Sequence, residues 1–487
     1  MKIPEEVKFV LKELEKNGFE AFIVGGCVRD TLIKKEPSDW DITTSAKPKD
    51  IEKIFDETYS NNDFGTVTVR IKKTKDEFFE TEITPYRIES KYTDKRHPDK
   101  IKWAKSLEED LKRRDFTVNA MAISIKNTKF EIVDLFNGQK DLKDKLIRAV
   151  GNPEDRFSED ALRMMRAVRF YSALGIGWEI ERKTEEAIKK NSHFLSVISK
   201  ERIRDELIKI VMSDKAKQGI ELLRSLGLLK HIIPELEEGY KIGQNKHHIY
   251  DIYDHNLRCL DYAVKKDYGF YVRMAALLHD VAKPRTKEGE GIDSTFYNHE
   301  IVGAKMTRDI LGRLKFSGKD IKMIVRLVRY HLFYYNVGEV SETSVRRLVR
   351  KVGLENIKEL LQVRYCDRIG SGCPKAEPYK LRHLKYLVEK TSKDPVSVKM
   401  LMVSGKDIIE ILNLSPGPKI GQILDILLGH VLACPNENKK DILTKKINEL
   451  GRLSEKELRS LAEKAKKERE DIKTKQDNMT KKKYWVS

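Results

Sequence analysis

The sequence predicts an α+β fold in which a mixed α/β domain is followed by helical domains. Short runs rich in β-branched and aromatic residues, which are typical of strands, are confined to the first 150 residues. After about Gly151 the apolar residues recur at helical spacing instead. A chain of 487 residues is longer than one compact core usually holds, so several domains are expected.

The first 150 residues are predicted to combine helices and strands. Helical spacing of the apolar residues covers residues 7–19, with a stop at Gly18, and residues 47–55. The predicted strands are residues 21–26, 39–44, 66–71 and 78–86.

Helical patterns occupy nearly all of the remaining chain. They include residues 158–175, 202–213 and 216–232, and several of them open with Ser or Asp, which favour helix N-termini. Residues 463–487 lack an apolar face, so a frayed helix is expected to pass into a disordered basic tail. The predicted domain boundaries are 1–150, 151–215, 216–390, 391–465 and, for the disordered tail, 466–487.

The composition favours a polyanionic partner. The formal net charge is +18, which would favour nucleic acid through the release of counterions, although a merely soluble lysine-rich protein would look similar. The five cysteines have no CxxC spacing, which fits a reducing compartment. The N-terminus is too charged for a signal peptide, and no run of about 20 apolar residues exists. A cytoplasmic protein that does not span a membrane is expected.

Two aspartates flank a tryptophan in the predicted strand 39–44. Side chains alternate along a strand, so Asp39 and Asp41 are expected to share one face and to repel each other. Such a pair suits divalent cations, which prefer oxygen ligands, and Glu82 on a neighbouring strand is the candidate third carboxylate. A two-metal site of this kind suits phosphoryl or nucleotidyl transfer, whereas the alternative is an ordinary solvated turn.

The stretch "GGCVRD" precedes this pair. It matches neither the Walker P-loop nor the G-x-G-x-x-G pattern. Gly25 and Gly26 would let backbone N–H groups approach a phosphate at the start of a helix, and Arg29 would add a bidentate contact.

These motifs resemble the head of the class II tRNA nucleotidyltransferases, the CCA-adding enzymes, and of the related poly(A) polymerases. G-G-x-V-R-D followed by D-x-D is similar to the first motif of the family. Further similar motifs follow in the family's order at residues 110–122, 134–157, 159–170 and 199–207. The resemblance implies a head at 1–150, a nucleotide-selecting and RNA-binding neck at 151–215, a body at 216–390 and a tRNA-binding part at 391–465.

The resemblance also assigns roles to residues. It implies that Asp39 and Asp41 bind Mg²⁺ with Glu82 as a less secure partner, and that Gly26 and Arg29 contact phosphates. Within "RRDFTVNA", it gives Arg114 to the triphosphate, Asp115 to the sugar and Asn119 to the loop. Arg166 and Arg169 would be nucleotide-binding or neck-stabilising residues. For the adjacent Arg113 and Arg114 of "RRDFTVNA", the alternative is a surface patch.

Asp160 and Arg163 are implied to select the base. They are three residues apart, so both are expected on one surface of a helix. Cytosine and adenine each present an amine beside a ring nitrogen, which a carboxylate and a guanidinium would bind. Uracil and guanine would turn a carbonyl toward Asp160, and one unpaired buried polar group costs about 1–3 kcal/mol. A simple ladder of salt bridges is the alternative interpretation.

A second set of residues resembles the HD phosphohydrolase superfamily. Imidazoles and carboxylates in this order suit a divalent metal. The candidate ligands are His255, His279, Asp280, His299, His331 and Asp367. The resemblance implies an HD-type body, and it leaves open whether the domain is active. The alternative is a set of unrelated core and surface histidines.

The predicted function is template-independent addition of CCA to the tRNA 3′ end from CTP and ATP. The polar segment 87–101 is expected to be a flexible loop, which in the family is implicated in adding the final A, and residues 403–440 resemble the family's tRNA-binding end. The alternatives are an A-adding enzyme or poly(A) polymerase, an HD-type phosphohydrolase with an RNA-binding head, an alarmone hydrolase–synthetase, and an inactive RNA-binding protein.

Overall fold

The computed structural model describes two compact units. Its described residues are 2–60, 65–74, 77–90, 100–126, 129–245, 249–392, 398 and 401–486. The first unit comprises Met1–Leu332 and Glu359–Pro374, and the second comprises Phe333–Lys358 and Lys375–Ser487. The predicted boundary at residue 390 does not coincide with this division.

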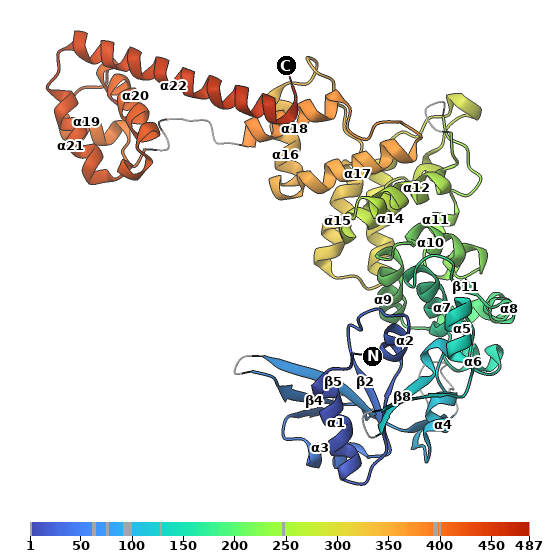
Figure 1. Ribbon diagram of the computed structural model, residues 1–487. Helices are drawn as coiled ribbons and strands as arrows, with labels where there is room; N and C mark the ends of the chain where they lie inside the picture. The colour runs from blue at the N-terminus through green and yellow to red at the C-terminus, as the bar shows by residue number, and fades with distance from the viewer. Residues whose placement is uncertain are drawn as a thin grey trace. The chain divides into compact units, whose positions relative to one another are not determined.

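The head of the first unit is built on a seven-stranded sheet with the order β3-β4-β5-β2-β1-β8-β9 (Figure 1). The strands are β1 (Ala21–Val24), β2 (Asp41–Thr44), β3 (Thr58–Ser60), β4 (Val67–Lys72), β5 (Phe78–Pro85), β8 (Met121–Lys126) and β9 (Lys129–Asp134). All four strands predicted in this region are therefore present. The core of the sheet is apolar, with Ile23, Ile42 and Ile83 fully buried.

The register of the sheet places the predicted carboxylates together. Strands β2 and β5 are parallel, with Asp41 beside Glu82, and β1 is antiparallel to β2, with Val24 beside Asp41. Strand β2 begins only at Asp41, so the expectation that Asp39 belongs to the strand is wrong, although Asp39 and Asp41 line the same cavity. The Trp40 side chain turns into the core, and its carbonyl accepts a hydrogen bond from Thr81 Oγ1 at 2.6 Å, which fixes the approach to the strand.

Helices cover the sheet and supply the glycine turn. Helix α1 (Glu5–Lys16) contacts β1, and α3 (Pro48–Ile54) contacts β4 and β5, so both predicted helices are confirmed. Helix α2 (Gly26–Leu32) follows β1 directly and contacts β8. Two further helices of the head are α4 (Leu107–Lys112) and α5 (Gly138–Asp144).

The segment 87–101 is not a loop throughout. Strands β6 (Arg87–Ser90) and β7 (Lys100–Trp103) pair antiparallel at its two ends, since their backbones satisfy each other. Residues 91–99 lie outside the described part of the chain.

The neck is helical, as the sequence predicts. Its helices are α6 (Pro153–Glu159), α7 (Leu162–Ala173), α8 (Arg182–Asn191), α9 (Lys200–Val211) and α10 (Ala216–Ser225), and β10 (Leu146–Ile147) pairs with β11 (Glu179–Ile180). The expected single helix over 158–175 is interrupted, because Asp160 is extended at the end of α6. Its carboxylate instead accepts a hydrogen bond from the Leu162 N–H at the start of α7.

A second helical bundle completes the first unit. Its helices are α11 (Pro234–Glu237), α12 (Ile252–Lys265), α13 (Phe270–Leu278), α14 (His299–Arg313), α15 (Gly318–Tyr330) and α17 (Ile357–Gly370). The short 3₁₀ helices described in the chain are Thr117–Asn119, Ser192–Val197, Leu229–His231, Lys283–Thr286, Gly291–Asp293, Leu354–Asn356 and Pro435–Glu437. Helix α13 is buried along its length, which matches its apolar sequence.

The second unit is wholly helical in its described residues. Its helices are α16 (Glu342–Val352), α18 (Tyr379–Ser392), α19 (Gly405–Leu412), α20 (Pro418–Ala433), α21 (Lys440–Gly451) and α22 (Glu455–Tyr484). Buried leucine, isoleucine and valine side chains of α19 to α22 form one core cluster, which includes Ile408, Leu427, Leu443 and Leu458.

The expected disorder after residue 466 is not what the structure shows. Helix α22 continues to Tyr484, and a capping box formed by Ser454 and Glu457 fixes its start. Polar contacts replace the missing apolar face: Tyr386 donates a hydrogen bond to Asp477 at 2.6 Å, and Lys483 pairs with Glu389 at 2.6 Å. These two contacts hold the described end of this helix against α18.

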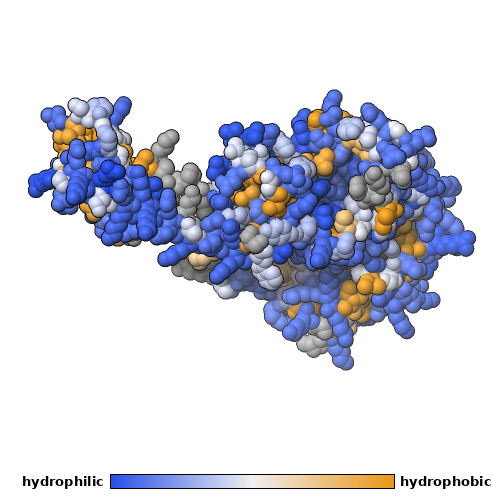
Figure 2. Space-filling model, turned by 90° about the horizontal axis from the view of Figure 1, so that it is seen from above, coloured by the Kyte–Doolittle hydropathy of each residue, from blue (hydrophilic) through white to orange (hydrophobic). Residues whose placement is uncertain are grey.

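The surface is predominantly hydrophilic in the view of Figure 2, with small separate groups of hydrophobic residues. Among the described residues, no helix combines the length and apolar character needed to cross a bilayer.

Candidate active site and metal centre

One cavity of about 800 Å³ in the head and neck brings together the predicted residues of the first site. Its lining includes Gly25, Gly26, Arg29, Asp39, Asp41, Glu82, Arg114, Asp115, Asn119, Asp160, Arg163, Arg166 and Arg169. These residues come from loops, strands and helices up to 144 positions apart in the sequence (169 − 25). The fold therefore assembles the carboxylates and the arginines in one place.

The carboxylates form the acidic part of this cavity. Asp39 and Glu82 are exposed, and Asp41 is partly buried. Burial, followed by the neighbouring charge of Asp39 and a smaller effect of Glu82, raises the pKa of Asp41 to about 6, although Arg114 opposes the shift. Crowded oxygen donors that raise each other's proton affinity fit a hard divalent cation, which would relieve the repulsion.

Gly25 lies between the acidic and the basic groups. Its backbone has φ +82° and ψ −140°, a conformation that residues with a side chain rarely adopt. A Cβ atom at this position would lie 3.3 Å from both Arg114 Nη1 and Asp41 Oδ2. The glycine therefore permits the turn and keeps space open beside the carboxylate.

A chain of hydrogen bonds links the motifs behind the cavity. Arg29 Nη1 donates to Asn119 Oδ1 at 2.8 Å, and Asn119 Nδ2 donates to Asp115 Oδ1 at 3.3 Å. Arg166 Nε donates to Asp115 Oδ2 at 2.7 Å. Burial raises the pKa of Asp115, but Arg166 more than offsets this and lowers it to about 2. Asp115 is thus ionised and held in place by the neck.

Arg29 has a second protein partner besides Asn119. Its guanidinium also pairs with Asp30 at 2.8 Å, so the group is held by two protein partners beside the cavity. Arg114 is oriented by Asp110, which the sequence did not single out: Arg114 Nη2 lies 3.1 Å from Asp110 Oδ2. Asp110 is fully buried and also pairs with Arg113 at 2.7 Å.

The two predicted base-selecting residues are both engaged by protein groups. Arg202 of α9 pairs with Asp160 Oδ2 at 2.6 Å, and Arg163 pairs with Glu159 at 2.6 Å. Arg163 Nη2 also donates to the carbonyl of Arg113 at 2.9 Å. Asp160 and Arg163 line the same cavity, but they are not neighbours on one helix as expected, because Asp160 lies in the break before α7.

Two residues that contact predicted site residues in the neck were not predicted from the sequence. Arg202 lies within the motif at 199–207, and only its contact with Asp160 reveals a role. Glu206, one turn further along α9, pairs with Arg169 at 2.7 Å while remaining almost fully buried. Their i,i+4 spacing places both on one face of α9, a signal that could have predicted them.

The second site lies in the helical bundle, where the four predicted histidines surround the predicted carboxylate of Asp280. His255 and His279 Nε2 lie 3.2 and 3.3 Å from Asp280 Oδ2. His299 and His331 Nε2 lie 3.4 and 3.6 Å from Asp280 Oδ1. All four histidines and Asp280 are buried, so this cluster is a closed set of nitrogen and oxygen donors.

Asp367 joins the cluster from α17. Its Oδ1 atom lies 3.5 Å from His255 Nε2 and 3.8 Å from His279 Nε2, and Arg364 pairs with Oδ2 at 2.6 Å. Burial lowers the pKa of His279, but Asp280 and Asp367 outweigh this and raise it to about 10. The carboxylates of Asp280 and Asp367 therefore favour a positive charge at His279.

The orientation of three rings suits metal binding. The Nδ1 atoms of His279, His299 and His331 lie 2.7–2.9 Å from the carbonyls of Ala276, Phe296 and Val328. A carbonyl only accepts, so each Nδ1 carries the hydrogen and each Nε2 is the atom directed at Asp280. Backbone carbonyls commonly orient metal-ligating imidazoles in this way.

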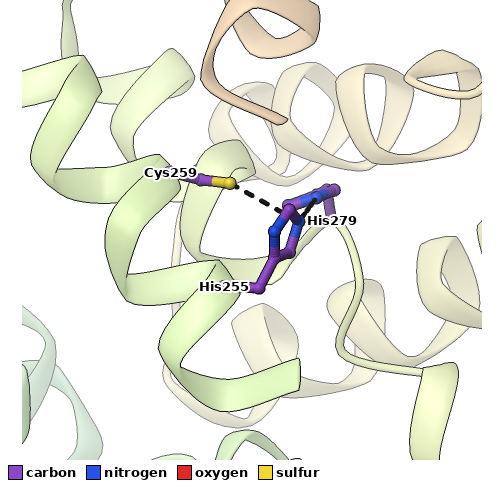
Figure 3. A group of neighbouring side chains, drawn as sticks. All are labelled: His255, Cys259 and His279. Atoms are coloured by element: carbon purple, nitrogen blue, oxygen red, sulfur yellow. Dashed lines mark hydrogen bonds between the residues drawn. The ribbon is translucent and has the colours of Figure 1, made fainter. Parts of the chain in front are cut away.

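Among the described residues, two groups of three have potential metal-binding atoms that all lie within 4.8 Å of one another. The first group is His255, Cys259 and His279 (Figure 3), and the second is His279, Asp280 and His331. The carboxylates of Asp39, Asp41 and Glu82 do not form such a group. Cys259 was not predicted, although its position four residues after His255 places both on one face of α12.

A cavity of about 530 Å³ opens beside the second site. Asp280, His299, His331 and Asp367 reach it, and Lys283, Arg364 and Arg368 add positive charge to its lining. Lys283 Nζ also pairs with Asp280 Oδ2 at 2.7 Å. Positive groups beside a cluster of metal-ligating donors suit an anionic phosphate substrate.

Family models match three successive parts of the chain. Residues 21–148 match the poly(A) polymerase head domain, 177–239 match the model described as "probable RNA and SrmB-binding site of polymerase A", and 252–371 match the HD domain. The fold and the cavity thus place the head in the poly(A) polymerase head class of nucleotidyltransferases.

Relatives identify the family. The CCA-adding enzyme of Lactococcus lactis subsp. lactis is 33% identical over 439 residues, which cover 88% of this chain and 93% of that protein. The CCA-adding enzyme of Enterococcus faecalis is 32% identical over 460 residues, covering 91% and 95%. The chain belongs to the family of CCA-adding enzymes.

Other matches extend over different shares of the chain. The CCA-adding enzyme of Ligilactobacillus salivarius is 50% identical over 233 residues, so this match spans 47% of the chain and about half, 55%, of that relative. The crystal structure of the Bacillus stearothermophilus CCA-adding enzyme in complex with CTP is similar with a TM-score of 0.58 and 28% identity, covering 93% of this chain and 98% of that one. The Thermotoga maritima CCA-adding enzyme complexed with tRNA, at 19% identity and a TM-score of 0.51, shares the fold.

Proposed function

We propose that the head and neck add CCA to the 3′ end of tRNA from CTP and ATP without a nucleic-acid template. The observation that carries this proposal is the 800 Å³ cavity in which Asp39, Asp41 and Glu82 face a row of arginines and Asp160. Family membership adds the substrate class, because relatives are described as CCA-adding enzymes and one was crystallised with CTP.

In this proposal the acidic side of the cavity holds the metal. Asp39 and Asp41 bind Mg²⁺, and Glu82 is the third carboxylate, placed beside Asp41 by the parallel register of β2 and β5. Bound Mg²⁺ would activate the tRNA 3′-hydroxyl and stabilise charge on the phosphate. The hydroxyl attacks the α-phosphate of the incoming nucleotide, and pyrophosphate leaves.

The basic side of the cavity positions the nucleotide. The open space beside Gly25 admits the triphosphate, and Arg114, aligned by Asp110, binds its charge. Asp115, held ionised by Arg166, accepts a hydrogen bond from the sugar hydroxyl. Gly26 and Arg29 contact the phosphates from the start of α2, and Asn119 fixes Arg29.

Asp160 and Arg163 select cytosine and adenine by their amine and ring nitrogen. Both are already held by protein partners, because Arg202 pairs with Asp160 and Glu159 pairs with Arg163. Arg169, paired with Glu206, stabilises the neck beneath them. The second unit and the positive charge of the chain would bind the tRNA acceptor arm through the shape and the phosphates of the RNA. The cytoplasmic location stays a prediction.

A tRNA lacking CCA tests this function. After incubation with CTP, ATP or both, sequencing of the 3′ ends should show CC with CTP alone and CCA, followed by a stop, with both nucleotides. Addition of A only to ends that already carry CC would support an A-adding enzyme, and long A tails would support a poly(A) polymerase. Either result would overturn CCA addition.

A second candidate function is supported by the HD cluster. We propose that it binds a divalent metal and hydrolyses a phosphate ester, because six metal-ligating residues lie beside a cavity lined by Lys283, Arg364 and Arg368. Hydrolysis of 2′,3′-cyclic AMP and of p-nitrophenyl phosphate by the metal-loaded protein tests this. Activity should vanish in Asp280→Asn, and equal activity in that variant would exclude the site.

A further inference from the structure

A cysteine adjoins the HD cluster at its most enclosed end. Cys259 lies one turn after His255 on α12, and its Sγ atom is 3.6 Å from His255 Nε2 (Figure 3). His279, from the end of α13, places its Nε2 atom 3.1 Å from His255 Nε2. All three side chains have no exposed surface. We name these residues the thiol corner.

The spacing of these atoms matches ligands around one tetrahedral ion. With metal–nitrogen bonds of about 2.0–2.1 Å and metal–sulfur bonds of about 2.3 Å, tetrahedral angles separate two nitrogens by about 3.3 Å and nitrogen from sulfur by about 3.5 Å. The observed separations are 3.1 and 3.6 Å. These two separations are close to the tetrahedral values, and all ligand atoms of the three residues lie within 4.8 Å of one another.

Asp280 supplies an oxygen in the same place. Its Oδ2 atom lies 3.2 Å from His255 Nε2 and 3.3 Å from His279 Nε2, close to the same tetrahedral separation. Its other oxygen faces His299 and His331, so the carboxylate has one atom for each side of the cluster. Together, the thiol corner and Asp280 therefore offer two nitrogens, one sulfur and one oxygen as ligand atoms.

The backbone prepares His279 and crowds Cys259 into position. The Nδ1–H group of His279 donates to the carbonyl of Ala276 at 2.9 Å, which leaves Nε2 to bind. A Cβ atom on Gly370 of α17 would lie 2.3 Å from Cys259 Sγ, so the glycine makes room for the sulfur. A larger residue at position 370 would displace the sulfur from the histidines.

We propose that Cys259 is a metal ligand and that His255, Cys259, His279 and Asp280 hold a zinc-class transition ion rather than Mg²⁺. A thiolate is a soft ligand that favours zinc over magnesium, which prefers octahedral oxygen ligands. On binding, the thiol transfers its proton to solvent and the sulfur forms the bond to the ion. This inference rests on the metal site proposed above for the HD cluster and names one further ligand and the class of metal.

Cobalt substitution tests the proposal on the full-length protein. A Co²⁺–thiolate bond gives a charge-transfer absorption band in the near ultraviolet, and imidazole and carboxylate ligands do not. The wild-type protein loaded with Co²⁺ should show this band, and Cys259→Ala should lose it while the circular dichroism spectrum is unchanged. Cys366→Ala, which removes another fully buried thiol from α17, is the matched control and should keep the band.

The outcomes separate this inference from the proposal it rests on. Cobalt bound through His279 without the band, or a band that persists in Cys259→Ala, overturns the cysteine ligand alone. Failure of the cluster to bind any metal overturns the HD metal site as well. Competition between Zn²⁺ and Mg²⁺ should favour Zn²⁺, and the Zn²⁺ dissociation constant should rise at least about tenfold in Cys259→Ala.

X-ray absorption of the zinc-loaded wild-type protein keeps the test decisive if the variant does not fold. One sulfur at about 2.3 Å from zinc is expected. A shell that contains nitrogen and oxygen alone would contradict the proposal without any substitution.

Discussion

The head cavity and the HD cluster both gather carboxylates, but their surroundings differ. In the head, Asp39 and Glu82 are exposed, and the described lining of the cavity contains carboxylates but no histidine or cysteine. In the cluster, Asp280 is buried among four imidazoles. An open set of oxygens suits Mg²⁺, which keeps several waters and binds substrate phosphates, whereas buried nitrogen donors suit transition ions. Under the proposed functions, this difference predicts two independent metal chemistries in one compact unit.

The largest expected effect is on the head carboxylates. Glu82→Gln should lower the rate of CMP addition to tRNA at least about a hundredfold, because loss of a metal ligand costs several kcal/mol of transition-state stabilisation. Glu80→Gln is the matched control, since Glu80 lies on the same face of β5 two residues away and pairs with Arg70. Its rate should stay within twofold of the wild type. Equal losses in the two variants would remove Glu82 from the site.

Base selection should depend on Asp160. Asp160→Ala should reduce the preference for CTP over UTP by about ten- to a hundredfold, because an unpaired polar group costs about 1–3 kcal/mol. Incorporation from each nucleotide in single-turnover reactions measures this. Asp155→Ala, at an exposed position on helix α6, which ends just before Asp160, should leave the preference unchanged. Unaltered selectivity in Asp160→Ala would place base recognition elsewhere.

The head site should respond to pH through Asp41. Its pKa is raised to about 6, so the carboxylate gains a proton and loses its charge as pH falls through 6. The Mg²⁺ concentration needed for half the maximal rate should therefore rise below pH 6, by up to about tenfold per pH unit for one competing proton. Titrations of Mg²⁺ at pH 7, 6 and 5 measure this requirement. A constant requirement across these pH values would contradict the assignment.

A smaller effect is expected from the glycine turn. Gly25→Ala and Gly18→Ala should each cost about 1–3 kcal/mol of folding stability, because both residues have positive φ, +82° and +83°. Only at Gly25 would the new Cβ atom approach Arg114 and Asp41, whereas Gly18 has no neighbour within 4 Å. Thermal unfolding should therefore be similar for the two variants, and transfer should slow in Gly25→Ala alone. Equal transfer rates would show that the space beside Asp41 is not needed.

The two regions also differ in how much the sequence revealed. The head strands were predictable because short runs of β-branched residues bounded by Gly and Pro are typical of strands. The site was predictable because "GGCVRD" and D-x-D lie within 17 residues of sequence (41 − 25 + 1). The strand limits were less predictable: Asp39 precedes β2, since Trp40 turns inward and anchors the bend. The helix expected over 158–175 is broken at Asp160, because the Asp160 carboxylate accepts a hydrogen bond from the Leu162 N–H at the start of α7.

Contacts between distant segments were beyond sequence reasoning. Arg202 and Asp160 are 42 residues apart, and only the packing of α9 beside α7 brings them together. Cys259 was a scattered cysteine in the sequence until α12 and α13 placed it beside His255 and His279. The continuation of helix α22 to Tyr484 was not predicted, because its end is held by contacts such as Lys483 with Glu389 and Tyr386 with Asp477 rather than by an evident apolar face.

The independence of the two sites is tested most directly by crossing two variants with two assays. CCA addition to a tRNA lacking it, and metal content of the HD cluster, are measured for the wild type, Asp41→Asn and Asp280→Asn. We expect Asp41→Asn to lose addition and keep the cluster metal, and Asp280→Asn to keep addition and lose that metal. CCA addition that persists in Asp41→Asn, or that disappears in a folded Asp280→Asn variant, would contradict the account.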